Sequence, residues 1–174
     1  MEEYTKTLKI AAYLLEYPDR GWWEDFEDCR KAVEEVETPQ ARAVFKEFFA
    51  YVDETGAKEY EEQYVRSFDF SQNTNLYLTT QERTDFGKQS NEMHKYKALF
   101  LENGYDLDKE LPDYLPAVLE LAGSLSKEKA GEVLKLARGK IETLRTRFIE
   151  AKLAQAFLLD VVLTTANGLE GSAA

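Results

Sequence analysis

The side chains that most often carry catalysis are scarce in this chain, which has one histidine, His94, and one cysteine, Cys29. A zinc site needs several imidazole or thiolate ligands, and a carboxylate-bridged di-iron bundle needs two Glu-x-x-His pairs. A nucleophilic triad would depend on His94 as its base, and no Gly-x-Ser-x-Gly turn accompanies it. Phosphate loops and dinucleotide fingerprints are also absent. We therefore expect no metal, no cofactor and no catalytic residue.

Carboxylates are the reactive groups that the chain holds in excess, with 33 Asp and Glu against 22 Lys and Arg. Asp106, Asp108 and Glu110 alternate as in a calcium loop, but no glycine stands at the turn position. Pro112 interrupts the continuation, so a solvated acidic loop is the better interpretation. A small helical enzyme that uses carboxylates alone, with or without magnesium, is an alternative hypothesis that abundance by itself does not support.

The composition also restricts the kinds of partner. The 174 residues carry a formal net charge of −11 with a pI of about 4.7, and 44% of them are hydrophobic, which is enough to build a core. A surface this acidic repels nucleic acid backbones and anionic lipid headgroups. We expect no nucleic acid partner and no direct membrane insertion, whereas a basic peptide or protein is favoured.

The start of the chain and the cysteine count indicate where the protein works. Met1-Glu2-Glu3-Tyr4 is acidic where a signal peptide needs positive charge. No apolar run reaches the roughly 18–20 residues of a membrane span. A single cysteine fits a reducing compartment. The sequence therefore predicts a soluble cytoplasmic protein that is not exported.

Apolar residues recur at helical spacing almost throughout, so we expect an all-α, single-domain bundle of about seven to eight helices over residues 1–170, followed by a loose tail at 171–174. Thr38 and Pro39 predict one helix start, and Ser126 predicts another. Thr79 and Glu82 have capping-box spacing and predict a helix that ends at Asn103-Gly104. The expected helical ranges are 4–17, 22–36, 39–52, 58–68, 79–103, the segment around 115–122, and 126–167.

The last helical stretch is too long to remain straight. As one rod, residues 126–167 would span about 63 Å at ~1.5 Å per residue. A compact domain of this size is only about 35 Å across. We expect the rod to fold back between Thr146 and Lys152, and the protein to be a monomer or a dimer that exchanges helices at this turn.

Three segments are richer in aromatic and acidic residues than a packed core requires: Glu62–Phe70, Asn75–Thr79 and Glu110–Pro116. In one interpretation, Tyr64 and Phe68 are core residues and the loops only connect helices. In the other, the segments form a groove with an aromatic floor and an acidic rim. Such a groove would accept the apolar face of an amphipathic or basic peptide and pair with its Arg or Lys residues.

These segments carry a resemblance to a known family. The run Tyr64-Val-Arg-Ser-Phe68-Asp69-Phe70 is followed by Leu76-Tyr77-Leu78-Thr79 and later by Glu110-Leu-Pro112-Asp113-Tyr114-Leu-Pro116, with Leu119-Glu120. In order and spacing, over about residues 4 to 125, this pattern resembles the NarJ-type assembly chaperones of respiratory nitrate reductase, which belong with the TorD-like maturation chaperones of molybdoenzymes. Between Thr79 and Met93 the chain departs from the pattern, although Asp85 and Gly87 are retained roughly in place.

The resemblance implies an all-helical chaperone that is not an enzyme. It would bind the N-terminal segment of a molybdopterin-containing catalytic subunit, most commonly the nitrate reductase alpha subunit, and keep it competent for cofactor insertion before membrane attachment or export. The Pro112-Asp113-Tyr114 loop would lie at or near the binding surface. The partner-binding residues predicted from the segments and the resemblance together are Tyr64, Phe68, Asp69, Tyr77, Asp85, Pro112, Asp113, Tyr114, Pro116 and Glu120.

Alternatives to a transient helper for nitrate reductase stay open. The departure after Thr79 leaves room for another oxidoreductase of the molybdopterin superfamily as the client. A structural subunit that remains in a finished oxidoreductase complex would have a similar composition. Co-purification with the mature enzyme would separate that subunit from a transient chaperone.

Overall fold

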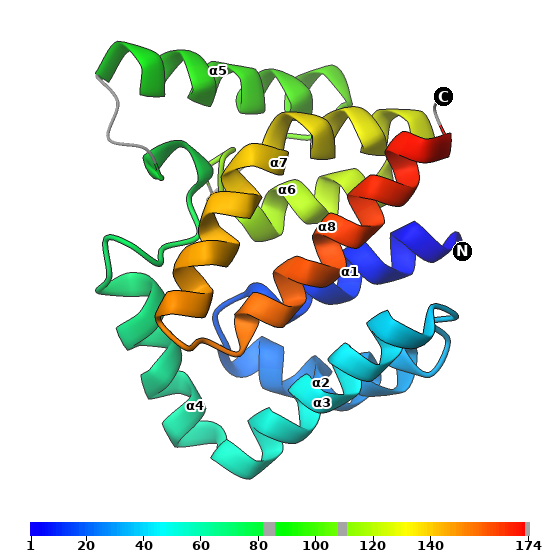
Figure 1. The fold of residues 1–174 in the computed structure, drawn as a ribbon, viewed down its shortest axis with the longest axis vertical. Coiled ribbons are helices and arrows are strands. Elements are labelled where there is room, and N and C mark those ends of the chain that lie inside the picture. Colours follow the sequence, from blue (N-terminus) through cyan, green and yellow to red (C-terminus); the bar gives the residue numbers. More distant parts are fainter. Residues whose placement is uncertain (82–85, 108–110, 173–174) are drawn as a thin grey trace.

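The computed structural model describes residues 1–81, 86–107 and 111–172, which form eight α-helices and no strand (Figure 1). The all-α prediction is therefore confirmed, and one isolated bridge between Tyr77 and Tyr114 is the β-type pairing in the described part. A π-helical turn, η1 (Val65–Asp69), follows the fourth helix, and a 3₁₀ turn, η2 (Leu78–Thr80), precedes the fifth. The helices are α1 (Glu3–Leu15), α2 (Arg20–Val33), α3 (Pro39–Thr55), α4 (Ala57–Tyr64), α5 (Phe86–Glu102), α6 (Leu115–Ser124), α7 (Lys127–Glu150) and α8 (Gln155–Ser172).

Helix α1 is central to the packing, because it contacts α6 on one side and α8 on another. Its predicted stripe is buried completely at Leu8, Ala11 and Leu15. Gly123 of α6 allows the close approach of α1, since a Cβ at this position would lie 3.1 Å from the side chain of Lys9. Helices α7 and α8 pack side by side, while α5 lies along one edge of the molecule (Figure 1).

Helix α3 begins at Pro39 with Thr38 in the N-cap position, as predicted, but the Thr38 side chain is engaged elsewhere. The Thr38 side chain makes no capping hydrogen bond. Instead, the Glu3 carboxylate of α1 accepts hydrogen bonds from the backbone N–H groups of Glu37 and Thr38, each at 2.9 Å to Oε2. Partial burial opposes ionisation of Glu3, but these hydrogen bonds outweigh it and lower the pKa of the carboxyl group.

The long C-terminal stretch folds back as predicted, at the end of the expected window. Helix α7 ends at Glu150 and α8 begins at Gln155. The turn places Lys152 in the left-handed region, with φ of 59°. Glycine is the usual residue in this conformation, but here the position is occupied by lysine. Ser126 caps α7 by accepting a hydrogen bond from the N–H of Lys129, again as predicted. Helix α8 continues to Ser172 and so includes the first two residues of the expected tail.

The predicted capping box at Thr79 is wrong for the residue that the structure describes. Thr79 lies in η2, and its hydroxyl donates a hydrogen bond to the Asp113 carboxylate instead of capping a helix. Glu82, the other half of the box, lies outside the described residues, and the described part of α5 begins at Phe86. The end of α5 is as predicted, because Gly104 follows with φ of 79°.

Candidate functional site

Two of the segments singled out in the sequence meet directly in the structure. The Leu78 N–H donates to the Asp113 carbonyl at 2.9 Å, and the Leu115 N–H donates to the Leu76 carbonyl at 2.8 Å. The rings of Tyr77 and Tyr114 lie 5.2 Å apart between their centroids. The loop before α6 is therefore paired with the loop before η2, as one short antiparallel bridge.

Asp113 supports this pairing from inside. Its side chain is 0% exposed. Oδ2 accepts hydrogen bonds from the Thr79 backbone N–H at 3.1 Å and the Thr79 hydroxyl at 2.7 Å. Oδ1 is buried with no hydrogen-bond partner among the described residues. A partner protein has no access to Asp113 in this arrangement, so we assign it to positioning the two loops.

Replacing Asp113 with alanine should lower the free energy of unfolding by about 1–2 kcal/mol, because the Thr79 N–H and hydroxyl lose their acceptor. The substitution also removes the buried Oδ1, which has no hydrogen-bond partner among the described residues, and this gain offsets part of the loss. Asp113→Asn keeps an acceptor oxygen and should lie closer to the parent protein. Urea denaturation of the three proteins provides the comparison, and unchanged stability of the alanine variant would contradict the positioning role.

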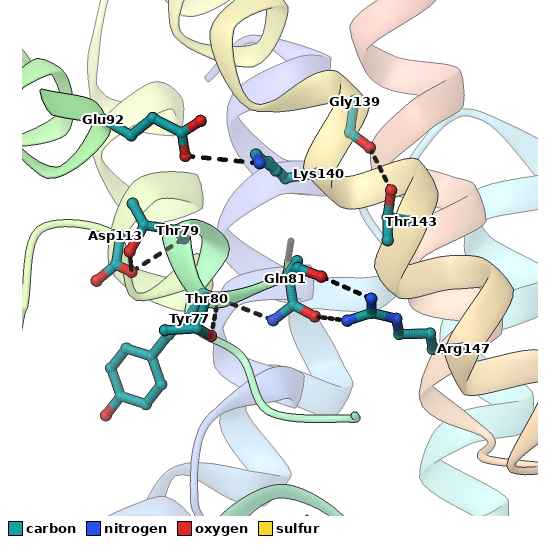
Figure 2. A network of polar contacts seen from close by, with 10 residues as sticks. All are labelled: Tyr77, Thr79, Thr80, Gln81, Glu92, Asp113, Gly139, Lys140, Thr143 and Arg147. Atoms are coloured by element: carbon teal, nitrogen blue, oxygen red, sulfur yellow. Dashed lines mark hydrogen bonds and ion pairs between the residues drawn. The ribbon is translucent and has the colours of Figure 1, made fainter. Parts of the chain in front are cut away.

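A second set of polar contacts fixes residues 75–81 from the other side. Figure 2 shows Gln81 between Tyr77 and Arg147: its amide nitrogen donates to the Tyr77 carbonyl at 2.8 Å, and its side-chain oxygen accepts from the Arg147 guanidinium at 2.6 Å. Arg147 also donates to the Gln81 carbonyl at 2.6 Å. In the same view, Glu92 of α5 pairs with Lys140 of α7 at 3.5 Å. Helix α7 thus anchors both the loop and α5.

Tyr64 and Phe68 are core residues in the structure. Tyr64 is 3% exposed, and its hydroxyl donates to the Leu15 carbonyl at 2.6 Å. Burial, with the nearby Tyr114 hydroxyl, raises the pKa of Tyr64 well above its ordinary value. Phe68 packs between Tyr64 and Phe148, with ring centroids at 4.7 and 5.4 Å. Of the two interpretations of this segment, the one that assigns Tyr64 and Phe68 to the core agrees with the structure.

The accessible site begins next to Tyr114, in a pocket of about 470 Å³. It lies between the residues that follow α1, the length of α6, and the end of α5 with the residues after it. Four of its lining side chains are carboxylates, and none is Lys, Arg or His. We call it the acidic pocket. Its lining residues are Glu16, Tyr17, Asp19, Phe100, Tyr105, Asp106, Leu107, Tyr114, Ala117, Glu120, Leu121 and Ser124.

A neighbouring pocket of about 610 Å³ lies along α5. We call it the α5 pocket. It shares Phe100, Tyr105, Asp106 and Leu107 with the acidic pocket, so the two have a common wall. The rest of its lining comes from Thr79, Thr80, Gln89, Ser90, Met93, His94, Lys97, Leu101, Leu111 and Pro112.

Large exposed hydrophobic side chains gather at these two pockets. Tyr17, Leu101, Tyr105 and Leu111 are between 41% and 58% exposed, and each of them lines one pocket or both. Exposed apolar groups clustered in a concave surface are typical of a binding site. The sequence pattern does not single out Tyr17, Leu101 or Tyr105, because residue type and spacing do not separate an exposed apolar side chain from a buried one.

The predicted partner-binding residues therefore divide into groups. Tyr114 and Glu120 line the acidic pocket, and Pro112 lines the α5 pocket. Glu120 is also paired with Lys9 at 2.8 Å. Tyr77 is half-buried against Tyr114. Five other predicted residues line neither pocket: Tyr64, Phe68, Asp113 and Pro116 are buried, and Asp69 is exposed on η1. Asp85 lies outside the described residues.

The described residues offer little reactive chemistry. They hold no group of three or more His, Cys, Asp or Glu side chains that could bind a metal ion. Burial raises the pKa of the Cys29 thiol to about 12, with Asp25 contributing, which keeps the thiol protonated. His94 is exposed on α5. Among the helices in the described ranges, none is both long and apolar enough to cross a bilayer.

The described residues form an all-helical bundle with two adjoining pockets, which are lined by aromatic, aliphatic and acidic side chains. The chain belongs to the nitrate reductase delta subunit family, whose model matches residues 34–155. The family identified from the motifs is thereby confirmed.

Curated relatives extend the similarity over most of the chain. A probable nitrate reductase molybdenum cofactor assembly chaperone NarJ from Bacillus subtilis (strain 168) is 29% identical over 164 residues, which cover 94% of this chain and 89% of the relative. The nitrate reductase molybdenum cofactor assembly chaperone NarJ from Escherichia coli (strain K12) is 28% identical over 92% of this chain and 69% of its own length. Both are named as chaperones and not as enzymes.

Proposed function

We propose that this protein is a cytoplasmic assembly chaperone for a molybdoenzyme, with nitrate reductase as the first client to test. It binds the N-terminal segment of the catalytic subunit and keeps that subunit competent for insertion of the molybdenum cofactor before membrane attachment or export. Membership of the delta subunit family and the names of the relatives support the class of activity.

The acidic pocket is the observation that carries the binding part of this proposal. Its carboxylates stand beside exposed or half-exposed rings of Tyr17, Tyr105 and Tyr114. Carboxylates pair with Arg and Lys through charge-assisted hydrogen bonds, while rings cover the apolar side of the same segment. An amphipathic, basic peptide satisfies both surfaces at once, whereas an acidic or phosphorylated ligand would be repelled.

Isothermal titration with a synthetic peptide of the first 20 or so residues of the nitrate reductase catalytic subunit tests the proposal. We expect binding at micromolar concentrations and an affinity that falls several-fold as salt rises from about 0.1 to 0.5 M, because the Debye length shortens from about 10 Å toward a few ångströms. A residual affinity should persist at high salt, because the aromatic wall is not screened.

A peptide from an internal, acidic segment of the same subunit is the matched control and should give no heat. Absence of heat from the N-terminal peptide, with both components soluble and the protein folded, would contradict the proposed function. If the affinity does not change with salt, the peptide does not bind through the carboxylates of the acidic pocket.

A further inference from the structure

We infer that the two pockets hold one peptide in one direction, with its N-terminal end in the acidic pocket and its following residues across the shared wall into the α5 pocket. This inference rests on the proposed function and adds a polarity to it. The pockets are connected through Phe100, Tyr105, Asp106 and Leu107, which line both of them.

The two pockets differ in charge. The acidic pocket has Glu16, Asp19, Asp106 and Glu120 in its lining and no basic side chain. Lys9, which pairs with Glu120, offsets part of that charge from outside the lining. The α5 pocket keeps only the shared Asp106 as an acid and adds the basic Lys97, with His94 beside it. Along the combined groove, the charged groups of the lining therefore change from four carboxylates to one carboxylate and one ammonium group.

A peptide segment has a matching asymmetry. Its free N-terminus carries an α-ammonium group with a pKa of about 8, so it is largely cationic at neutral pH. If the segment is helical, its N-terminal end carries about half a positive elementary charge and its C-terminal end the opposite. Both contributions favour the N-terminal end beside the carboxylates, and the helix dipole favours the C-terminal end beside Lys97.

Apart from Asp106, the wall between the pockets is aromatic and aliphatic, and it suits the middle of such a segment. Phe100 is buried at 5% exposure and forms the base, while the exposed Tyr105 and the half-buried Leu107 flank it. On the far side, Met93 and Leu101 of α5 continue the apolar lining. A peptide with basic residues near its start and apolar residues after them would place the basic residues in the acidic pocket and the apolar residues on the wall. A peptide with the reverse order would not fit both surfaces in this direction.

Paramagnetic relaxation in a 15N-labelled sample of the whole protein tests the direction. The catalytic-subunit peptide is prepared with a nitroxide on its first or on its last residue. The first-residue label should broaden the amide signals of Glu16, Asp19 and Ser124 most strongly. The last-residue label should instead broaden those of Ser90, Met93 and Lys97, and the same peptides with the nitroxide reduced provide the reference spectra.

The outcomes separate this inference from the proposed function. If neither peptide shifts or broadens any signal, the proposed function itself fails. If both bind but the broadening patterns are exchanged, or are identical for the two labels, binding stands and the direction is overturned. Signals broadened away from both pockets, for example along α2, overturn the placement in these pockets as well.

Changing the charge at each end of the groove gives a second readout. Lys97→Glu should weaken a peptide with a free C-terminal carboxylate more than the same peptide with an amidated end, by several-fold. Asp19→Asn should reduce the benefit of a free over an acetylated N-terminus. Equal effects on free and blocked ends at both positions would contradict the assigned direction.

Discussion

Replacing Phe68 with alanine is expected to lower the free energy of unfolding by about 3–5 kcal/mol. The ring is 5% exposed and packs against Tyr64 and Phe148, which join η1 to α7. Truncation removes buried apolar area and leaves a cavity between elements distant in the chain. Urea denaturation followed by fluorescence of Trp22 and Trp23, which lie in the packed aromatic cluster of α2, measures the loss.

Phe68→Leu is the matched control, because it keeps most of the volume and should cost less than the alanine variant. Peptide binding by the folded fraction of either variant should be close to that of the parent protein. An alanine variant as stable as the parent but unable to bind would show that Phe68 contacts the partner, as the motif-based prediction has it, and that its buried position is wrong.

The helical architecture was predictable because its signals are local. The apolar stripe of α1, the Pro39 start of α3, the Ser126 cap of α7 and the glycine after α5 each depend on residues within one or two turns. The fold-back of the C-terminal stretch followed from length alone. Its position was less sharp, because Lys152 adopts a left-handed conformation that its residue type does not announce.

The contacts that shape the site were not predictable, because they join residues far apart in the sequence. Thr79 and Asp113 are 34 positions apart, and Gln81 and Arg147 are 66 apart. Thr79 had a local capping motif that competed with its tertiary partner, and the tertiary hydrogen bonds to a buried carboxylate prevailed. The Thr38 hydroxyl likewise donates to the distant Glu3 carboxylate at 3.1 Å instead of accepting from an N–H of α3.

The candidate site was predictable in kind but only partly in residues. An aromatic and acidic groove was one of two interpretations, and the structure has pockets of this composition, yet Tyr64 and Phe68 are buried and line neither of them. A four-residue spacing places both rings on one helical face without indicating whether that face is covered. Tyr114 and Glu120, predicted from the motifs to bind the partner, both line the acidic pocket, and their role in binding stays a prediction.

Replacing Tyr105 with alanine is expected to weaken binding of the catalytic-subunit peptide by roughly 30-fold, the effect of losing an interface residue worth about 2 kcal/mol. Tyr105 is 41% exposed and belongs to the wall shared by both pockets. Its backbone N–H donates to the Phe100 carbonyl at 2.9 Å, and that bond survives the substitution. Stability should change by no more than about 0.5 kcal/mol.

Phe157→Ala is the matched control, because Phe157 is 62% exposed at the start of α8 and lines neither pocket. It removes an aromatic ring of similar size and should leave peptide affinity unchanged. Titration calorimetry on the three proteins decides the matter. The peptide does not cross the shared wall if the parent protein and Tyr105→Ala bind it with equal affinity. The same conclusion follows if Tyr105→Ala and Phe157→Ala lose equal affinity, because a ligand seated on the wall contacts Tyr105 and not Phe157.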